Sequence, residues 1–169
     1  MDKAQHPALK LYSYHVWAND KLFGRLRELP HEVYTQELTS IFPTIETVMK
    51  HMYTTDLMWL EVMKNTPFPE VVAYVQRLRE EAVSAGFEEM EERFKHGAGL
   101  YEDFLGGSDL DKPITVTHPQ YGALETRLSE LVQHVVNHGT YHRGNVAAMI
   151  RQQGHAGVST DYVFYIYEQ

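Results

Sequence analysis

The residues that decide the fold run from Leu128 to Gly154 and read LSELVQHVVNHGTYHRGNVAAMIRQQG. Steps of three and four residues alternate through one set of positions, which is the spacing of side chains on a single face of a helix. These positions are Leu128, Leu131, Val135, His138, His142, Asn145, Met149 and Gln152. Because such a face normally packs against other helices, the stretch predicts a long bundle helix that ends at Gly154.

Two histidines stand in the middle of this face. His138 and His142 are four residues apart, so both imidazoles project from the same side of consecutive turns and can reach a single ion. Two histidines without partners in a bundle core are costly. The pair therefore indicates either a metal site or a buried polar network with Thr55, Asn145 and water.

A third donor is needed, because two histidines rarely make a tight site for a transition metal. The candidate is His51, in the stretch KHMYTTDLMWL, where it flanks the apolar face of another expected helix. Three neutral imidazoles from two helices leave one coordination position open. Structural zinc sites are usually closed by four protein ligands, whereas an open position is typical of catalytic sites.

Two neighbours of these histidines are interpreted as supporting residues. His134 lies eight residues before His142, about 12 Å along a helix, which is too far for both to meet one ion at about 2 Å. Asp56 follows His51 by five residues, about 140° round a helix, so it is a poor second ligand. It is expected to orient a neighbouring group or to bind a backbone amide.

Arg143 and Asn145 complete the supporting set. Arg143 is the one cation next to the histidine pair, and the sequence leaves open whether it pairs with Asp56 or Asp161 or meets an anionic substrate. The remaining histidines are interpreted as surface or loop residues without a role: His6, His15, His31, His96, His118 and His155.

Working outward, three more helical segments are predicted. The first runs from Pro7 to Leu29, and the second begins at a Ser40 cap, with Pro43 in its first turn, and stops before Asn65. The third runs from about Pro69 to Leu105, with a break or kink expected at residues 96–99.

Two shorter features flank the last long helix. Alternating residues predict a hairpin of Lys112–Thr117 against Ala123–Arg127. The aromatic tail DYVFYIYEQ is expected to cover the bundle or a partner subunit. Together the segments predict an all-α fold: a single domain, 1–169, built as a four-helix bundle with a small β-hairpin insert before the last helix.

Composition narrows the functional classes. The chain has 169 residues, 15 basic and 23 acidic, for a net charge of −8, which argues against a nucleic-acid surface. It has no apolar run of membrane-spanning length and no signal sequence, so we expect a cytoplasmic protein. It has no cysteine, so a metal site must use His, Asp, Glu or backbone oxygen, and any thiol must come with a substrate.

Four groups of residues resemble one family along nearly the whole chain. They are Tyr14 with Trp17-Ala18-Asn19, His51 with Asp56 and Trp59, the string from His134 to Gly144, and Thr160-Asp161-Tyr162. On these residues the chain resembles the DinB-like (DinB/YfiT) damage-inducible, metal-dependent four-helix bundles. Asn145 departs from the family pattern, which often has Gln there. The departure leaves the ligands untouched and alters a supporting bond.

The resemblance implies a bundle with a long crossover, a divalent metal held by His51, His138 and His142, and a homodimer. Members of the wider superfamily act as transferases or isomerases with a low-molecular-weight thiol. Three imidazoles suit Zn, Ni, Cu or Fe, of which Zn and Ni are the expected ions.

The functional hypothesis is a metal-dependent thiol S-transferase that acts on a small molecule. Two alternatives remain open. One is a metal-dependent hydrolase, which needs a general base such as His134 or Asp56. The other is a non-catalytic metal-binding protein of the stress response.

Overall fold

The decisive stretch forms one helix, α6 (Leu128–Gln152), within one residue or two of its predicted limits. The computed structural model describes residues 6–169 and contains, within them, seven helices and one two-stranded sheet. The other elements are α1 (Pro7–Arg27), α2 (Glu32–Thr35), α3 (Ile45–Met63), α4 (Phe68–Ala82), α5 (Phe87–Gly106), β1 (Pro113–His118), β2 (Gly122–Arg127) and α7 (Tyr162–Tyr167). The prediction of an all-α fold with a hairpin insert is confirmed.

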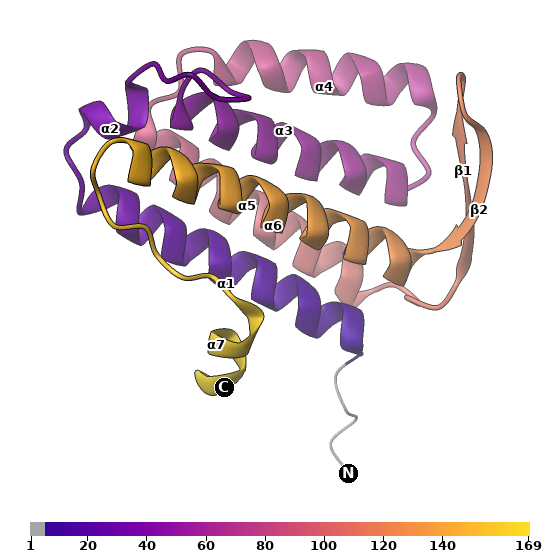
Figure 1. Cartoon of the computed structure of the whole chain (residues 1–169). Helices are drawn as coiled ribbons and strands as arrows, with labels where there is room; N and C mark the ends of the chain where they lie inside the picture. Colours follow the sequence, from indigo (N-terminus) through magenta and orange to yellow (C-terminus); the bar gives the residue numbers. More distant parts are fainter. Residues whose placement is uncertain (1–5) are drawn as a thin grey trace.

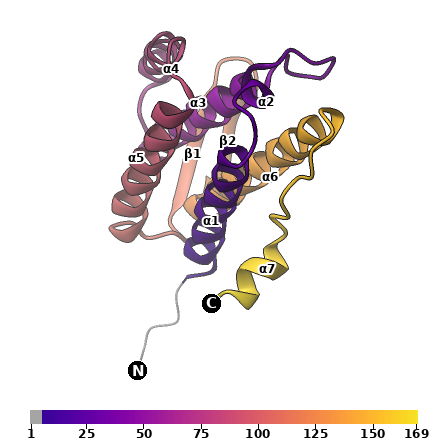
Figure 2. The ribbon, with the colours of Figure 1, turned by 90° about the vertical axis from the view of Figure 1, so that its left-hand side faces the viewer.

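The bundle consists of α1, α3, α5 and α6, and α4 lies outside it against α3 (Figure 1). α3 and α5 run in the same direction, and α4 returns the chain between them, so α4 is the long crossover (Figure 1). The view along the bundle in Figure 2 places α4 at the outer edge and α6 on the opposite side of the molecule. This order puts α6, which carries two of the candidate ligands, beside α3, which carries the third.

The start of α3 corrects the prediction of a Ser40 cap. The helix begins at Ile45, and the Thr44 side chain accepts a hydrogen bond from the Thr47 amide at 3.0 Å. The Leu38 amide donates to the Pro43 carbonyl at 2.8 Å, so Pro43 belongs to the loop before the helix. Ile41 lies in the same loop and is 70% exposed.

The prediction of a single third helix is wrong, because two helices, α4 and α5, form in that segment. The break falls at residues 83–86, where extended Gly86 precedes α5, and the Lys50 ammonium donates to the Val83 carbonyl at 2.8 Å. Residues 96–99, where a break was predicted, lie inside α5. Gly97 is buried there and faces Leu57 of α3.

The hairpin and the tail lie at two sides of the bundle (Figure 1). β1 and β2 pair antiparallel from Pro113–Arg127 to His118–Gly122, within one residue of the predicted strands. α7 packs on α1, where the Tyr14 hydroxyl donates to the Thr160 carbonyl at 2.8 Å. The tail therefore covers the bundle, which was one of the two predicted positions.

Within the described residues the structure also shows two short helices that the sequence did not predict, α2 and, in the aromatic tail, α7. α2 lies between the first two predicted helices, and it buries Val33 and Tyr34. Among residues 6–169, no helix has both the length and the apolar character needed to cross a membrane.

Candidate metal centre

α3 and α6 bring the three predicted ligands together. The Nε2 atom of His138 lies 3.2 Å from Nε2 of His51 and 3.0 Å from Nε2 of His142. One ring nitrogen from each residue lies within 4.8 Å of the others, so the three side chains could hold one metal ion. We call these three residues the triad.

A shared cation explains the short contacts inside the triad better than hydrogen bonds between the rings do. An imidazole Nε2 carries either one lone pair or one N–H, so it forms one well-aligned hydrogen bond, whereas Nε2 of His138 has two close nitrogen neighbours. A cation shared by three lone pairs removes this conflict. Tetrahedral ligands at 2.0–2.1 Å from zinc stand about 3.3 Å apart, close to the two distances observed. The donor set and its spacing therefore fit a divalent transition metal.

The electrostatics of the triad keep its rings neutral. Burial, followed by the neighbouring histidines, lowers the pKa of His138 to about 4, and burial and His51 do the same for His142. Burial, then the charge of Arg79, lowers the pKa of His51. Metal ligation requires the neutral imidazole. At neutral pH the rings are thus already in the form that ligates.

Two aromatic rings, those of Phe42 and Tyr141, border the triad. The ring of Phe42, in the loop before α3, lies 5.1 Å from the ring of His51 and 5.4 Å from that of His142. The half-exposed ring of Tyr141 lies 5.0 Å from His142. Sequence reasoning missed Phe42, because no local pattern shows that this loop folds back over α3 and α6.

Two of the predicted supporting residues lie beside the triad. The Asn145 side chain is 3.4 Å from Nδ1 of His142, the nitrogen that does not face the other ligands. His134 is exposed and does not ligate, as expected, and its ring lies edge-on 4.5 Å from the ring of Trp59. Its ring stacks 6.4 Å from that of His138, so it borders the triad without entering it.

Arg143 binds polar groups on α1 and α6, and not the two carboxylates that the sequence offered. It is 2% exposed, and its NH1 donates to the Asn19 side-chain oxygen at 2.9 Å while NH2 donates to the Thr140 hydroxyl at 2.9 Å. Among the described residues it forms no ion pair with Asp56 or Asp161. The side chain points towards α1, away from the face that carries the triad, and its guanidinium lies 5.5 Å from the Tyr14 ring.

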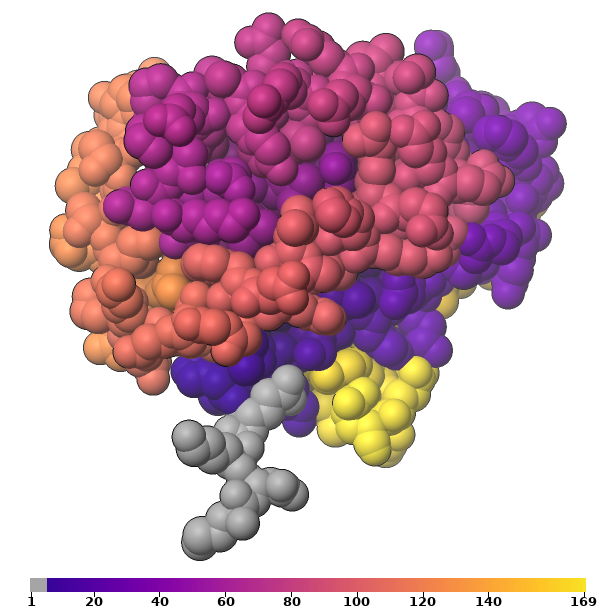
Figure 3. All heavy atoms as spheres, turned by 180° about the vertical axis from the view of Figure 1, so that it is seen from behind, coloured from indigo at the N-terminus to yellow at the C-terminus, as the bar shows by residue number. Residues whose placement is uncertain are grey.

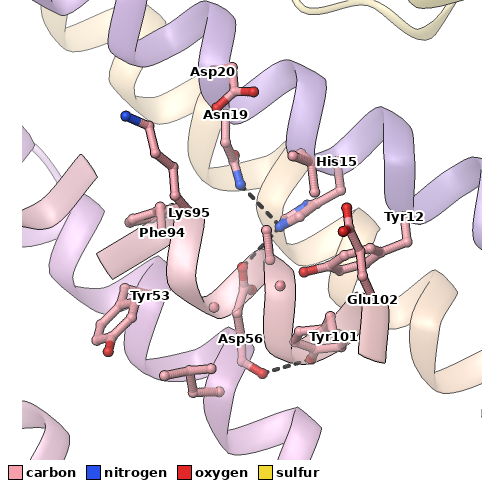
Figure 4. Close-up of a pocket in the computed structure, with 15 residues that line it drawn as sticks. Tyr12, His15, Asn19, Asp20, Tyr53, Asp56, Phe94, Lys95, Tyr101 and Glu102 are labelled. Carbon is pink, nitrogen blue, oxygen red and sulfur yellow. Dashed lines mark hydrogen bonds and ion pairs between the residues drawn. The ribbon is translucent and has the colours of Figure 1, made fainter. Parts of the chain in front are cut away.

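His15 corrects another prediction, because it was assigned no role and is 1% exposed. Its Nε2 lies 2.9 Å from Oδ2 of Asp56, and Figure 4 shows the ring reaching from α1 towards that carboxylate. Arg143, which can only donate, lies 3.3 Å from Nδ1 of His15. The ring therefore accepts at Nδ1 and donates its Nε2–H to Asp56. The sequence does carry a signal, since Leu11, His15, Ala18 and Leu22 share helical spacing.

A cavity of about 260 Å³ lies behind this pair, between α1, α3 and α5. His15, Asn19 and Asp56 form part of its wall, with Tyr12 and Tyr101 beside them (Figure 4). No triad histidine lines it. α5 crosses α1 on the face shown in Figure 3, which is the back of the view in Figure 1. The Asp56–His15 pair thus separates the cavity from the triad.

Comparison with known proteins identifies the family of the chain. Residues 1–169 match the sequence profile of the DinB family. Over 161 residues the chain is 45% identical to Protein DinB of Bacillus subtilis (strain 168), and the match covers 95% of this chain and 94% of that protein. The chain therefore belongs to the DinB family.

Proposed function

We propose that this chain is a metal-dependent enzyme of the thiol S-transferase type, which holds a divalent ion with the triad and acts with a low-molecular-weight thiol. The observation that carries the proposal is the convergence of three neutral imidazoles from α3 and α6. No fourth His, Cys, Asp or Glu joins the group within the described residues. A site with three protein ligands leaves room for a substrate atom.

A divalent ion, when bound, lowers the pKa of a thiol placed at its open position, and the thiolate is the reactive form. The chain's own residues prepare that position. Phe42 and Tyr141 give it aromatic borders, which suit an apolar electrophile. The chain has no cysteine, so no thiol of the protein competes with the small thiol. Zn and Ni are the proposed ions.

Hydrolysis is supported less well, because it needs a general base beside the triad. Oδ2 of Asp56 is engaged with His15, and Asp56 lines the cavity, which no triad histidine lines. His134 is exposed, and its ring packs edge-on against that of Trp59. The homodimer implied by the family resemblance stays a prediction, which light scattering of the purified protein tests.

The first experiment measures metal content. Protein purified without a histidine tag is expected to contain close to one Zn or Ni per chain, and His138→Ala to lose it. His134→Ala is the matched control, since it removes a histidine of the same helix that lies outside the triad, and it is expected to keep the metal. Equal metal content in the two variants contradicts the site.

The second experiment measures the reaction. Metal-loaded protein is incubated with an alkyl halide and a panel of small thiols such as cysteine and glutathione, and conjugate is measured by mass spectrometry. We expect conjugation that exceeds the uncatalysed rate and disappears in His138→Ala. If conjugation with every thiol equals that of the metal-free protein, the transferase proposal fails while the metal site can still stand.

A further inference from the structure

Five buried side-chain polar atoms of the described residues lack a hydrogen-bond partner, and two of them are Nδ1 of His138 and Oδ1 of Asp56. A buried polar atom without a partner is destabilising, so these two call for a physical explanation. One atom is on α6 and the other on α3, the two helices that carry the triad.

Neighbouring contacts hold the Asp56 carboxylate beside the turn of α6 that carries His138. Oδ2 of Asp56 lies 2.9 Å from His15. The His15 ring lies against Gly139, the residue after His138, so closely that a Cβ atom on Gly139 would stand 2.4 Å from it. The carboxylate, the His15 ring and the backbone of this turn are therefore packed together.

The orientation of the His138 ring agrees with this placement. Its Nε2 faces His51 and His142, so Nδ1, on another edge of the ring, does not take part in the triad.

We propose that Asp56 is the positioning residue of the metal centre, and that its Oδ1 accepts the Nδ1–H of His138 when Nε2 of His138 ligates the ion. This rests on the proposed function only in that the triad binds a metal. A histidine that ligates through Nε2 carries its proton on Nδ1 and almost always donates it to a carboxylate, a carbonyl or water. The pairing would satisfy both unpartnered atoms at once.

The same pairing also explains the contacts of His15 and Arg143. A buried carboxylate needs a compensating charge, and Arg143 supplies one through His15, since it donates to Nδ1 and fixes the ring with its N–H towards Asp56. The result is a continuous array from Arg143 through His15 and Asp56 to His138. Asp56 acts through His138 and does not itself reach the metal.

The first test of the array measures the zinc affinity of a variant that lacks the Asp56 carboxylate. Chelator competition with zinc is expected to give a Kd about 10–100-fold weaker for Asp56→Asn than for the wild type. Asp20→Asn is the matched control, because Asp20 is an exposed carboxylate that borders the same cavity, and its Kd is expected to stay unchanged. Denaturation of both metal-free variants measures any general loss of folding separately.

A second readout follows the proton itself. In ¹⁵N-labelled, zinc-loaded protein, the Nδ1–H of His138 is expected to exchange slowly and to give a downfield signal, which Asp56→Asn shifts or removes. Wild-type zinc affinity in Asp56→Asn overturns the inference, whereas retention of zinc by His138→Ala overturns the metal site. Should Asp56→Asn fail to fold, the wild-type spectrum decides, and a rapidly exchanging Nδ1 proton overturns the inference.

Discussion

Gly139 occupies the point of α6 where α1 comes closest. A side chain there would meet two atoms of His15, at 2.4 and 2.6 Å, and NH1 of Arg143 at 2.9 Å. His15 and Arg143 are held by other partners and cannot move away freely. The glycine in the middle of a long helix is therefore explained by packing, since glycine otherwise weakens a helix.

Gly139→Ala is expected to destabilise the protein by about 1–3 kcal/mol, because overpacking forces the buried polar pair apart. Gly144→Ala is the control on the same helix, since no neighbouring atom lies within 4 Å of its added Cβ, and it is expected to stabilise by about 0.5–1 kcal/mol. Urea denaturation measures both. Similar unfolding free energies for the two variants would contradict the packing argument.

The neutral triad makes the metal-free protein sensitive to acid. The pKa of His138 and of His142 is about 4 in the folded state, against an ordinary value of 6.5. Between these values the unfolded chain binds more protons, so the free energy of unfolding falls as the pH decreases from about 6.5 to 4. His142→Asn is expected to give a shallower slope. Denaturation of both metal-free proteins at several pH values checks this, and parallel slopes would count against it.

Helix spacing identified the two histidines on α6, because they lie on a mainly apolar face, and identified His51 because it flanks the apolar face of α3. The same rule applied to α1 would have included His15. What spacing cannot show is which polar atoms meet across helices. Arg143 illustrates this, since the sequence offered carboxylates as partners, whereas the fold gives it Asn19 and Thr140.

Element boundaries were predictable where one residue type enforces them and not where packing decides. Pro7 starts α1, and Gly154, with a φ of 82°, follows the end of α6, as their conformational preferences favour. The turn between α4 and α5 depends instead on a contact from Lys50 of α3 to the Val83 carbonyl, which no local pattern reveals. The start of α3 was mispredicted for a similar reason, because the loop before it packs over the triad through Phe42.

Several side chains of α7 contact α1, and Tyr165 is the one that is buried. Tyr165 is buried against Tyr14 and Trp17, with ring centroids at 5.9 and 5.8 Å, whereas Tyr167 is 83% exposed. Tyr165→Ala is expected to destabilise by about 3 kcal/mol, and Tyr167→Ala by less than about 0.5 kcal/mol. Thermal or chemical denaturation compares them. An equal effect of the two substitutions would show that α7 is not anchored as the structure has it.

The triad joins parts of the chain that are far apart in sequence, since His51 and His138 are separated by 87 residues. The sequence could propose this pairing only by assuming that α3 and α6 are neighbours, which the family resemblance implies and the fold shows. An ion held by both helices would therefore link the middle of the chain to its last long helix. Such a link acts on the folded state alone, because the unfolded chain does not hold the three rings together.

Zinc is accordingly expected to stabilise the whole fold in proportion to its affinity. A free metal concentration of 100 times Kd adds about 2.7 kcal/mol to the free energy of unfolding, which corresponds to a rise in Tm of about 5–11 °C for a chain of this length. Calorimetry of untagged protein with and without zinc measures the shift. Calcium, which prefers oxygen ligands, is the control ion and is expected to give no shift. His138→Ala is expected to melt at the same temperature with and without zinc, so a shift that survives in this variant would place the stabilising ion somewhere other than the triad.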